Sequence, residues 1–341
     1  MGPSIEKDVA GSVGVGRMLY AGIDEAGYGP RLGPLCVGMT LFEVPGACVA
    51  EGDQPADLWR LLRGAVCRDH AGSKRGRLAV ADSKALKGVG GAGVDPLFHL
   101  ERGVMAFESL ASEREAASNE TDLLARLGTR VPASIEWYAG DAALPRGTSL
   151  DQLRILIAQL QGSTEQTGVK PRLVRCVAVD ESTFNERYHH LQNKASVSFG
   201  VVGGLLRRLW ETAPPGSRVH VAVDRQGGRA FYGPLLTMAI GAEVVPVEES
   251  ERLSVYEVRG GRTMRIEFRV QAEETHLPVA LASMTAKLVR ELLMRRFNRY
   301  WTERIAGLKP TAGYGTDAGR WLRDVRGHAA AEEIEAMVRK A

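Results

Sequence analysis

Acidic residues lie at the ends of two apolar segments of the sequence. Asp24 closes the segment at 18–24, Glu25 follows it, and Asp224 directly follows the segment at 219–223. Carboxylates at the ends of buried strands cost solvation free energy unless they are exposed or bind a cation. Strands that end on one edge of a sheet can bring such acids together, and hard oxygen ligands suit Mg²⁺ or Mn²⁺. The pattern favours a two-ion site for phosphodiester hydrolysis over its alternative, solvated turn acids.

Two other polar pairs lack these features. Asp180 and Glu181 also follow an apolar segment, but Ser182 beside them favours the start of a helix, where acids are stabilised by the helix dipole. The pair His189 and His190 has no acid or cysteine at zinc-site spacing. We expect both pairs to lie outside the functional site.

The acids must be positioned by a sheet. Apolar and β-branched runs predict strands at 18–24, 34–43, 78–81, 173–179 and 219–223, a possible strand at 134–139, and a hairpin over 253–270. Helical patterns occupy 56–68, much of 95–170, 184–211, 278–303 and the region from 318 onward. An opening hairpin followed by alternating helices and strands predicts an α/β mixed sheet. Residues 1–16 are aperiodic and are expected to form a loose tail.

Composition restricts the partners and the compartment. Lys and Arg number 44 against 41 for Asp and Glu, so the net charge of +3 does not indicate a polyanion partner by itself. The cysteines Cys36, Cys48, Cys67 and Cys176 form no C-x-x-C pair, which favours free thiols in the cytoplasm. No apolar run is long enough to span a membrane. We expect a monomer.

Five motifs in order resemble those of type 2 ribonucleases H, the ribonuclease HII and HIII family. They are GIDEAGYGPRLGP at 22–34, Asp82-Ser83-Lys84, VAVD at 221–224, ALASMTAKLVRELLM at 280–294 and Gly313-Tyr314-Gly315-Thr316. The resemblance covers roughly 18–87 and 180–325. It implies a ribonuclease H-like catalytic domain at 17–341, with a mainly helical insertion at about 88–180.

The resemblance also implies an activity. Type 2 ribonucleases H are endonucleases that cut the RNA strand of RNA/DNA hybrids with two Mg²⁺ or Mn²⁺ ions. Asp24, Glu25 and Asp224 match three of the four catalytic, metal-binding acids. Counting ten residues back from Ser283 gives Glu273 as the fourth, with Glu274 as the alternative. A Glu at this position matches the Asp-Glu-Asp-Glu set of ribonuclease HIII.

The same motifs suggest substrate contacts. The residues concerned are Gly27, Tyr28, Gly29, Lys84, Ser283, Lys287 and Tyr314. Ribonuclease HII carries Arg where this chain has Tyr28, and a tyrosine lacks the guanidinium fork that helps recognise the ribose 2′-hydroxyl. Arg31 is a candidate substitute. The arginines of the long helix and its end, Arg290, Arg295, Arg296, Arg299 and Arg304, are expected to form a solvated face.

Other functions fit the sequence less well. The spacing of Gly27, Gly29 and Gly33 misses the dinucleotide-binding fingerprint, and no G-x-S-x-G elbow of a serine hydrolase occurs. The main alternative is a ribonuclease H-fold module that binds nucleic acid or protein without hydrolysing hybrids. Retention of four candidate acids favours hydrolysis, because clustered acids are costly unless a cation binds them.

Overall fold

The computed structural model describes residues 16–48, 54–73, 75–89 and 93–340. A seven-stranded mixed sheet forms its centre, in the order β5-β2-β1-β6-β9-β8-β7. The strands are β1 (Arg17–Ala26), β2 (Leu35–Pro45), β5 (Lys170–Val179), β6 (Arg218–Asp224), β7 (Glu243–Glu249), β8 (Leu253–Arg259) and β9 (Thr263–Arg269). The predicted α/β mixed sheet is therefore confirmed. The expected tail lies outside the described residues except for Gly16.

The central strands have a register that sets the site. β1 pairs antiparallel with β2, so Asp24 lies opposite Gly38. β1 also pairs parallel with β6, where Ile23 lies beside Val223. β6 in turn pairs parallel with β9. Because β1 and β6 run in the same direction, their carboxyl ends meet at one edge of the sheet.

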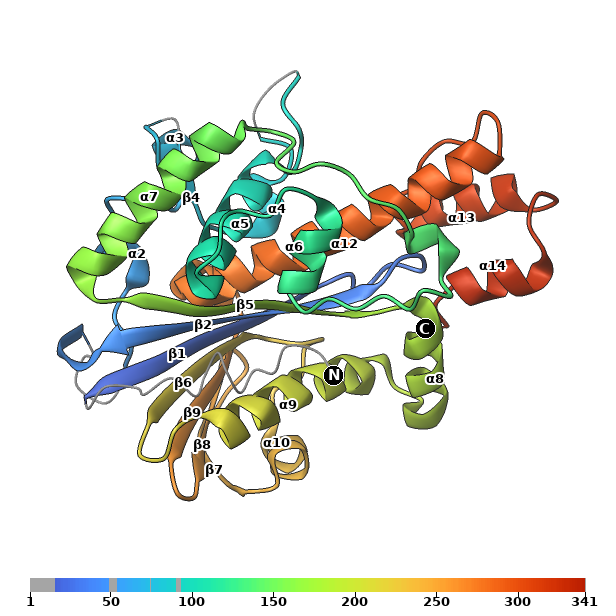
Figure 1. Cartoon of the computed structure of the whole chain (residues 1–341). Coiled ribbons are helices and arrows are strands. Elements are labelled where there is room, and N and C mark those ends of the chain that lie inside the picture. Colours follow the sequence, from blue (N-terminus) through green and yellow to red (C-terminus); the bar gives the residue numbers. More distant parts are fainter. Residues whose placement is uncertain (1–15, 49–53, 74, 90–92, 341) are drawn as a thin grey trace.

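Helices cover both faces of the sheet (Figure 1). One face carries α5 (Phe98–Ser112), α6 (Glu120–Arg126), α7 (Leu150–Thr167) and α12 (Leu277–Arg304), and the other carries α9 (Lys194–Thr212) and α10 (Gly233–Ile240). Each face has its own hydrophobic cluster, with Tyr20 and Phe42 in one and Leu19 and Ile23 in the other. This division follows from the two-residue period of β1 and β2.

The long helix α12 lies very close to the sheet because of two glycines. A Cβ added at Gly22 would lie 2.1 Å from the carbonyl carbon of Pro278, and one at Gly38 would lie 2.2 Å from the Ala282 oxygen. Any larger residue would push the helix away from β1 and β2. The two glycines therefore fix the distance between α12 and the ends of these strands.

The remaining elements are short. They are η1 (Gly46–Cys48), α2 (Leu58–Leu61), β3 (Val66–Cys67), α3 (His70–Ser73), β4 (Leu78–Ala79), α4 (Ser83–Leu86), η3 (Glu136–Tyr138), α8 (Glu181–Leu191), α11 (Ala272–Thr275), α13 (Gly315–Val325) and α14 (Ala331–Met337). β3 and β4 form a separate two-stranded sheet. The region proposed as an insertion, 88–180, ends in β5, which is an edge strand of the main sheet. The proposed domain limits remain a prediction.

Several predicted elements differ from the structure. The possible strand at 134–139 is wrong, since Glu136–Tyr138 is a 3-10 helix. The single helix predicted at 184–211 is two helices, because Gln192 adopts a left-handed conformation with φ of 48° and Asn193 caps the next helix. Strand β7 was not predicted; Pro246 interrupts its sequence and most of its residues are exposed. The helix predicted at 56–68 is confined to Leu58–Leu61.

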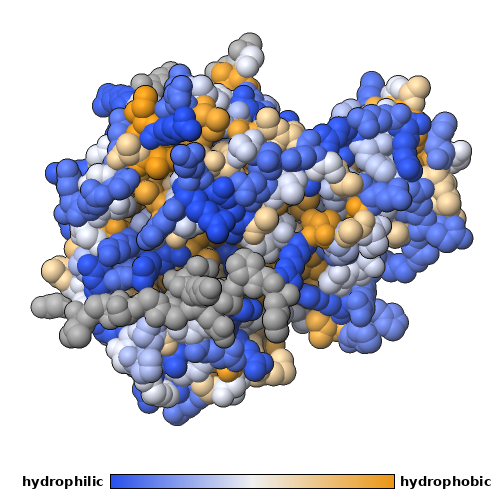
Figure 2. All heavy atoms as spheres, viewed as in Figure 1, coloured by the Kyte–Doolittle hydropathy of each residue, from blue (hydrophilic) through white to orange (hydrophobic). Residues whose placement is uncertain are grey.

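The surface in Figure 2 is mostly hydrophilic, with apolar residues gathered in small patches. Within the described residues, no helix combines the length and apolar character needed to cross a membrane.

Candidate active site

Asp24 and Asp224 are neighbours at the shared edge of β1 and β6. The parallel register ends with Ile23 beside Val223, and Asp24 and Asp224 are the residues that follow in the two strands. Both side chains lie on the face that α12 covers, and Asp24 is only 8% exposed. The Asp24 carboxylate accepts hydrogen bonds from the backbone of Glu25, at 2.7 Å, and from the Ser283 hydroxyl of α12.

Burial and mutual repulsion raise the pKa values of these acids. Burial, followed by the charges of Glu25 and Asp224, raises the pKa of Asp24 well above its usual range. Burial raises the pKa of Glu25 to about 7, and Asp224 contributes in the same direction. Burial also raises the pKa of Asp224. Carboxylates that destabilise one another in this way favour a bound cation.

Glu273 joins this group from α11. Gln271 takes a left-handed conformation with φ of 57°, which turns the chain from β9 into α11. The Ala272 amide then donates to Asp224 Oδ1 at 3.1 Å, and the Glu273 and Asp224 carboxyl groups share a hydrogen bond. Burial and the Asp224 charge raise the pKa of Glu273 to about 7. The neighbouring Glu274 is exposed, so the geometry favours Glu273 as the fourth acid.

Two of the predicted substrate contacts lie beside the acids. Lys84, on α4, is exposed, and its charge opposes the upward pKa shifts of both Glu25 and Asp224. The Asp82 side chain caps α4 by accepting from the Lys84 amide at 3.0 Å. Ser283 lies between Asp24 and Ser83, with 3.1 Å between the two serine hydroxyl oxygens. A lysine and a hydroxyl group therefore adjoin the carboxylates.

Two other predicted contacts have partners within the protein. The Lys287 ammonium pairs with Glu291 at 3.0 Å. Tyr314 is 40% exposed, and its ring lies 5.0 Å from the Arg290 guanidinium carbon. The structure does not place either residue against the four acids.

The loop after β1 carries Gly27, Tyr28 and Gly29. Gly27 has φ of +85°, and a Cβ there would lie 2.6 Å from Arg290 Nε, so glycine is required. Tyr28 is partly buried, Gly29 is exposed, and burial and the Glu25 charge raise the pKa of the Tyr28 hydroxyl. The Tyr28 side chain thus lies near the acid cluster.

Three functional or supporting residues were missed from the sequence. Gln226 donates from Nε2 to Glu25 at 3.2 Å and to Ser198 at 2.9 Å, which fixes the Glu25 carboxylate. The buried Arg290 donates to the Leu32 carbonyl at 3.1 Å, and the buried Arg339 donates from Nε to the Pro30 carbonyl at 3.0 Å. Arg290 and Arg339 hold the loop at 27–34.

The predicted solvated arginine face is wrong for two of its members. Arg290 and Arg296 are buried, because segments far away in the sequence cover them. Arg296 pairs with Glu120 at 2.9 Å. Asp180 and Glu181 have structural roles: Asp180 caps α8, and Glu181 accepts hydrogen bonds from Tyr138 and from the Gly33 amide.

The oxygen atoms of the four candidate acids are of the type that binds a divalent cation. Oxygen ligands predominate, and Glu273 Oε2 and Gln226 Oε1 are buried polar atoms without a hydrogen-bond partner. In the part of the chain that is described, however, no three His, Cys, Asp or Glu side chains are arranged tightly enough to hold a metal ion. The acids are neighbours, but their oxygens do not form a complete coordination shell.

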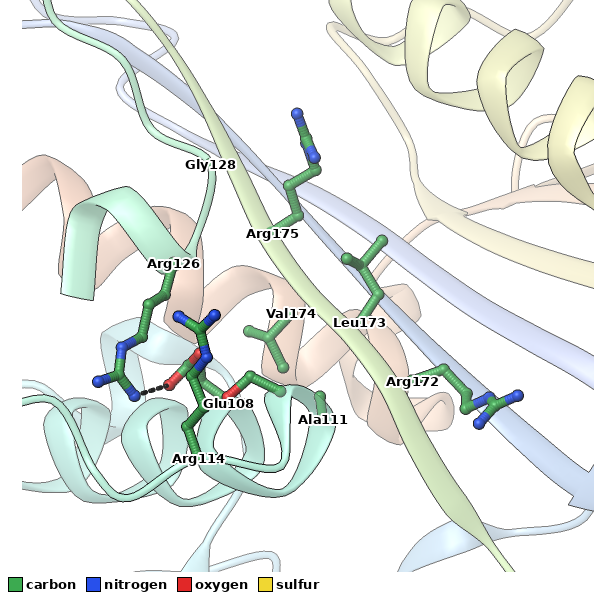
Figure 3. Close-up of a pocket in the computed structure, with 10 residues that line it drawn as sticks. Glu108, Ala111, Arg114, Arg126, Gly128, Arg172, Leu173, Val174 and Arg175 are labelled. Carbon is green, nitrogen blue, oxygen red and sulfur yellow. Dashed lines mark ion pairs between the residues drawn. The ribbon is translucent and has the colours of Figure 1, made fainter. Parts of the chain in front are cut away.

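A separate pocket of about 160 Å³ lies on β5, two strands away from β1. Figure 3 shows Arg114 and Arg126 directed toward Glu108 in this pocket. Arg126 pairs with Glu108 at 3.7 Å and with Asp122 at 2.6 Å, so its charge is already matched. None of the four candidate acids lines this pocket.

Solved structures with similar folds include type 2 ribonucleases H. Ribonuclease HII of Archaeoglobus fulgidus, solved with PCNA, is 16% identical with a TM-score of 0.41, over 94% of both chains. Ribonuclease H2 of Pyrococcus horikoshii OT3 is 14% identical with a TM-score of 0.38, over 94% of this chain and 92% of that one. Bst-RNase HIII, solved with Mn²⁺, is 13% identical with a TM-score of 0.41, over 95% of this chain and 66% of that one.

The likeness of this chain to these three solved structures is low both in sequence identity and in TM-score. No family model and no curated protein matches the sequence.

Proposed function

We propose that this chain is an endonuclease that hydrolyses the RNA strand of RNA/DNA hybrids with two Mg²⁺ or Mn²⁺ ions. The observation that supports the proposal is the meeting of Asp24, Glu25, Asp224 and Glu273 beside Lys84 and Ser283. Acids with raised pKa values in one cluster are a frequent sign of a functional site.

The four carboxylates would hold the ions, which supply an activated water and stabilise the leaving oxygen. Gln226 holds Glu25 in place through the bond at 3.2 Å. Lys84 would neutralise a phosphate of the strand, a role supported by the exposure of this residue and by the effect of its charge on Glu25 and Asp224. Ser283 orients Asp24 through the hydrogen bond to its carboxylate.

Cleavage of labelled nucleic acids tests this proposal. We expect Mg²⁺- or Mn²⁺-dependent cutting of an RNA/DNA hybrid, with no cutting of single-stranded RNA, duplex RNA or duplex DNA. Asp24→Asn and Asp224→Asn should abolish it, because an amide cannot supply the anionic ligand. Glu274→Gln is the matched control, since this exposed side chain lies next to the site.

The second candidate is a binding module without hydrolysis. It is favoured by the lack, within the described ranges, of a complete coordination group of three acids. Hybrid binding without cleavage at saturating Mg²⁺ and Mn²⁺ would support this module and contradict the nuclease. Turnover by either Asn variant equal to that of the wild type would exclude the proposed site.

A further inference from the structure

Lys194 lies at the start of α9 and contacts the loop that carries Tyr28. It is the first residue of α9, which Asn193 caps through its side chain. The Lys194 ammonium lies 4.9 Å from the centre of the Tyr28 ring, within the range of a cation–π interaction. The contact joins α9 to the loop that follows β1.

The positive charge of Lys194 is not balanced locally. No ion pair joins it to an acid in the ranges that the structure describes. Burial and the nearby Arg339 lower the pKa of Lys194. A cation at the start of a helix is also opposed by the helix dipole. Burial, the Arg339 charge and the helix dipole thus all disfavour the positive charge of Lys194. The negative charge of an external anion would offset these three effects.

Tyr28 links Lys194 to the acid cluster, because its ring contacts Lys194 and the Glu25 charge acts on its hydroxyl group. A Cβ added at Gly227, three residues after Asp224, would lie 3.2 Å from the Tyr28 hydroxyl oxygen and 3.8 Å from the Ala195 Cβ. Tyr28 therefore packs between the loop after β6 and the start of α9. Lys84 reaches the acids from the α12 face of the sheet, whereas Lys194 approaches from the α9 face.

We propose that Lys194, positioned by the Tyr28 ring, binds a backbone phosphate of the nucleic acid that lies across the four carboxylates. The inference rests on the proposed function. Lys194 then supplies a cation beside the loop position where Tyr28 itself has none. Tyr28 acts as a positioning residue.

The salt dependence of binding tests this contact. Hybrid binding is measured against KCl concentration with Mg²⁺ present, in the Asp24→Asn background so that the substrate is not cut. Each phosphate contact contributes about 0.9 to the slope of log K against log salt. We expect Lys194→Gln to reduce the slope by about 0.9 and Lys194→Arg to preserve it. Lys170→Gln, at the exposed start of β5, is the matched control and should leave it unchanged.

Two variants of Tyr28 test the positioning role. Tyr28→Phe keeps the ring and should bind with the wild-type slope, whereas Tyr28→Leu should lower the slope as Lys194→Gln does. An unchanged slope for Lys194→Gln in the Asp24→Asn background, with the wild type still binding and cleaving hybrids, overturns this inference alone. Failure of the wild type to bind any hybrid overturns the proposed function as well.

Discussion

Glu25 shows how burial beside other acids shifts the pKa of a single side chain. Its pKa is about 7 in the folded protein and rises mainly through burial. The folded state therefore binds a proton more tightly than the unfolded chain, whose glutamates titrate near 4.5. The sign follows from proton linkage: without metal, stability is lost as the pH rises from about 4.5 through 7.

Glu25→Gln should remove part of this loss. In EDTA at pH 8, we expect the variant to exceed the wild type in unfolding free energy by about 1–3 kcal/mol, with the difference vanishing near pH 4. Urea unfolding across this pH range measures it. A wild type that gains stability relative to Glu25→Gln between pH 5 and 8 would show that the site does not raise the pKa of Glu25.

Tyr28 determines a second prediction, about substrate choice. If a guanidinium in this loop helps locate a single ribonucleotide in DNA, the wild type should cut a run of four ribonucleotides better than one. Tyr28→Arg should then gain on the single-ribonucleotide duplex by roughly tenfold, the effect of one charge-assisted contact. The ratio of kcat/KM on the two duplexes is the measurement. Equal wild-type efficiency on both would exclude a role for Tyr28 in specificity.

Asp24, Glu25 and Asp224 were predictable because they lie at the ends of apolar runs, whereas Glu273 came only from the resemblance of the helix motif around Ser283. Asp24 and Asp224 close buried strands, and parallel strands place their carboxyl ends together. Gln226 was not predictable, since its contact with Glu25 depends on how the loop after β6 folds back on α9. The same holds for Lys194, whose sequence neighbours carry no motif.

At the scale of secondary-structure elements, the junction between α11 and α12 positions the fourth acid, Glu273. His276 caps α12 and follows Glu273 by three residues. The Tyr20 hydroxyl lies 2.5 Å from His276 Nδ1, and His276 Nε2 contacts the carboxylate of the buried Glu267 of β9. Burial alone would raise the pKa of Glu267, but hydrogen bonds from His220 and His276 hold it far below its usual value. These contacts tie the junction to β1 and β9.

Glu267→Gln should therefore destabilise the protein by about 3 kcal/mol at pH 7, because it removes a buried carboxylate that His220 and His276 both contact. Since the pKa of Glu267 is depressed, its contribution is present above about 4.5 and declines as the pH falls further. Glu257→Gln, a partly exposed acid of β8, is the control and should change stability by less than about 0.5 kcal/mol. Unfolding curves in which Glu267→Gln matches Glu257→Gln would contradict this account of the junction.

Elements with strong periodicity were predicted, and those shaped by contacts were not. The hairpin of β8 and β9 followed from alternation around Gly260 and Gly261. The break between α8 and α9 arises from one left-handed residue, Gln192, inside a continuous helical pattern. Arg290 appeared to belong to a solvated helix face, but loops from distant parts of the chain bury it.

At the scale of the whole molecule, the sheet order brings together acids that are far apart in sequence. The neighbours β1, β6 and β9 supply Asp24, Asp224 and, through α11, Glu273. The alternation of strands and helices indicated the mixed sheet, but not which strands would be adjacent. That β5 closes one edge of the sheet depends on pairing with β2 across more than a hundred residues.

The central claim is that these four carboxylates hold two divalent cations. Anomalous diffraction from crystals of the protein soaked in Mn²⁺ tests it most directly. We expect two peaks, roughly 4 Å apart, bound by Asp24, Glu25, Asp224 and Glu273, with Glu274 left in solvent. Mn²⁺ at other residues, with no peak among these four carboxylates at saturating metal, would contradict it.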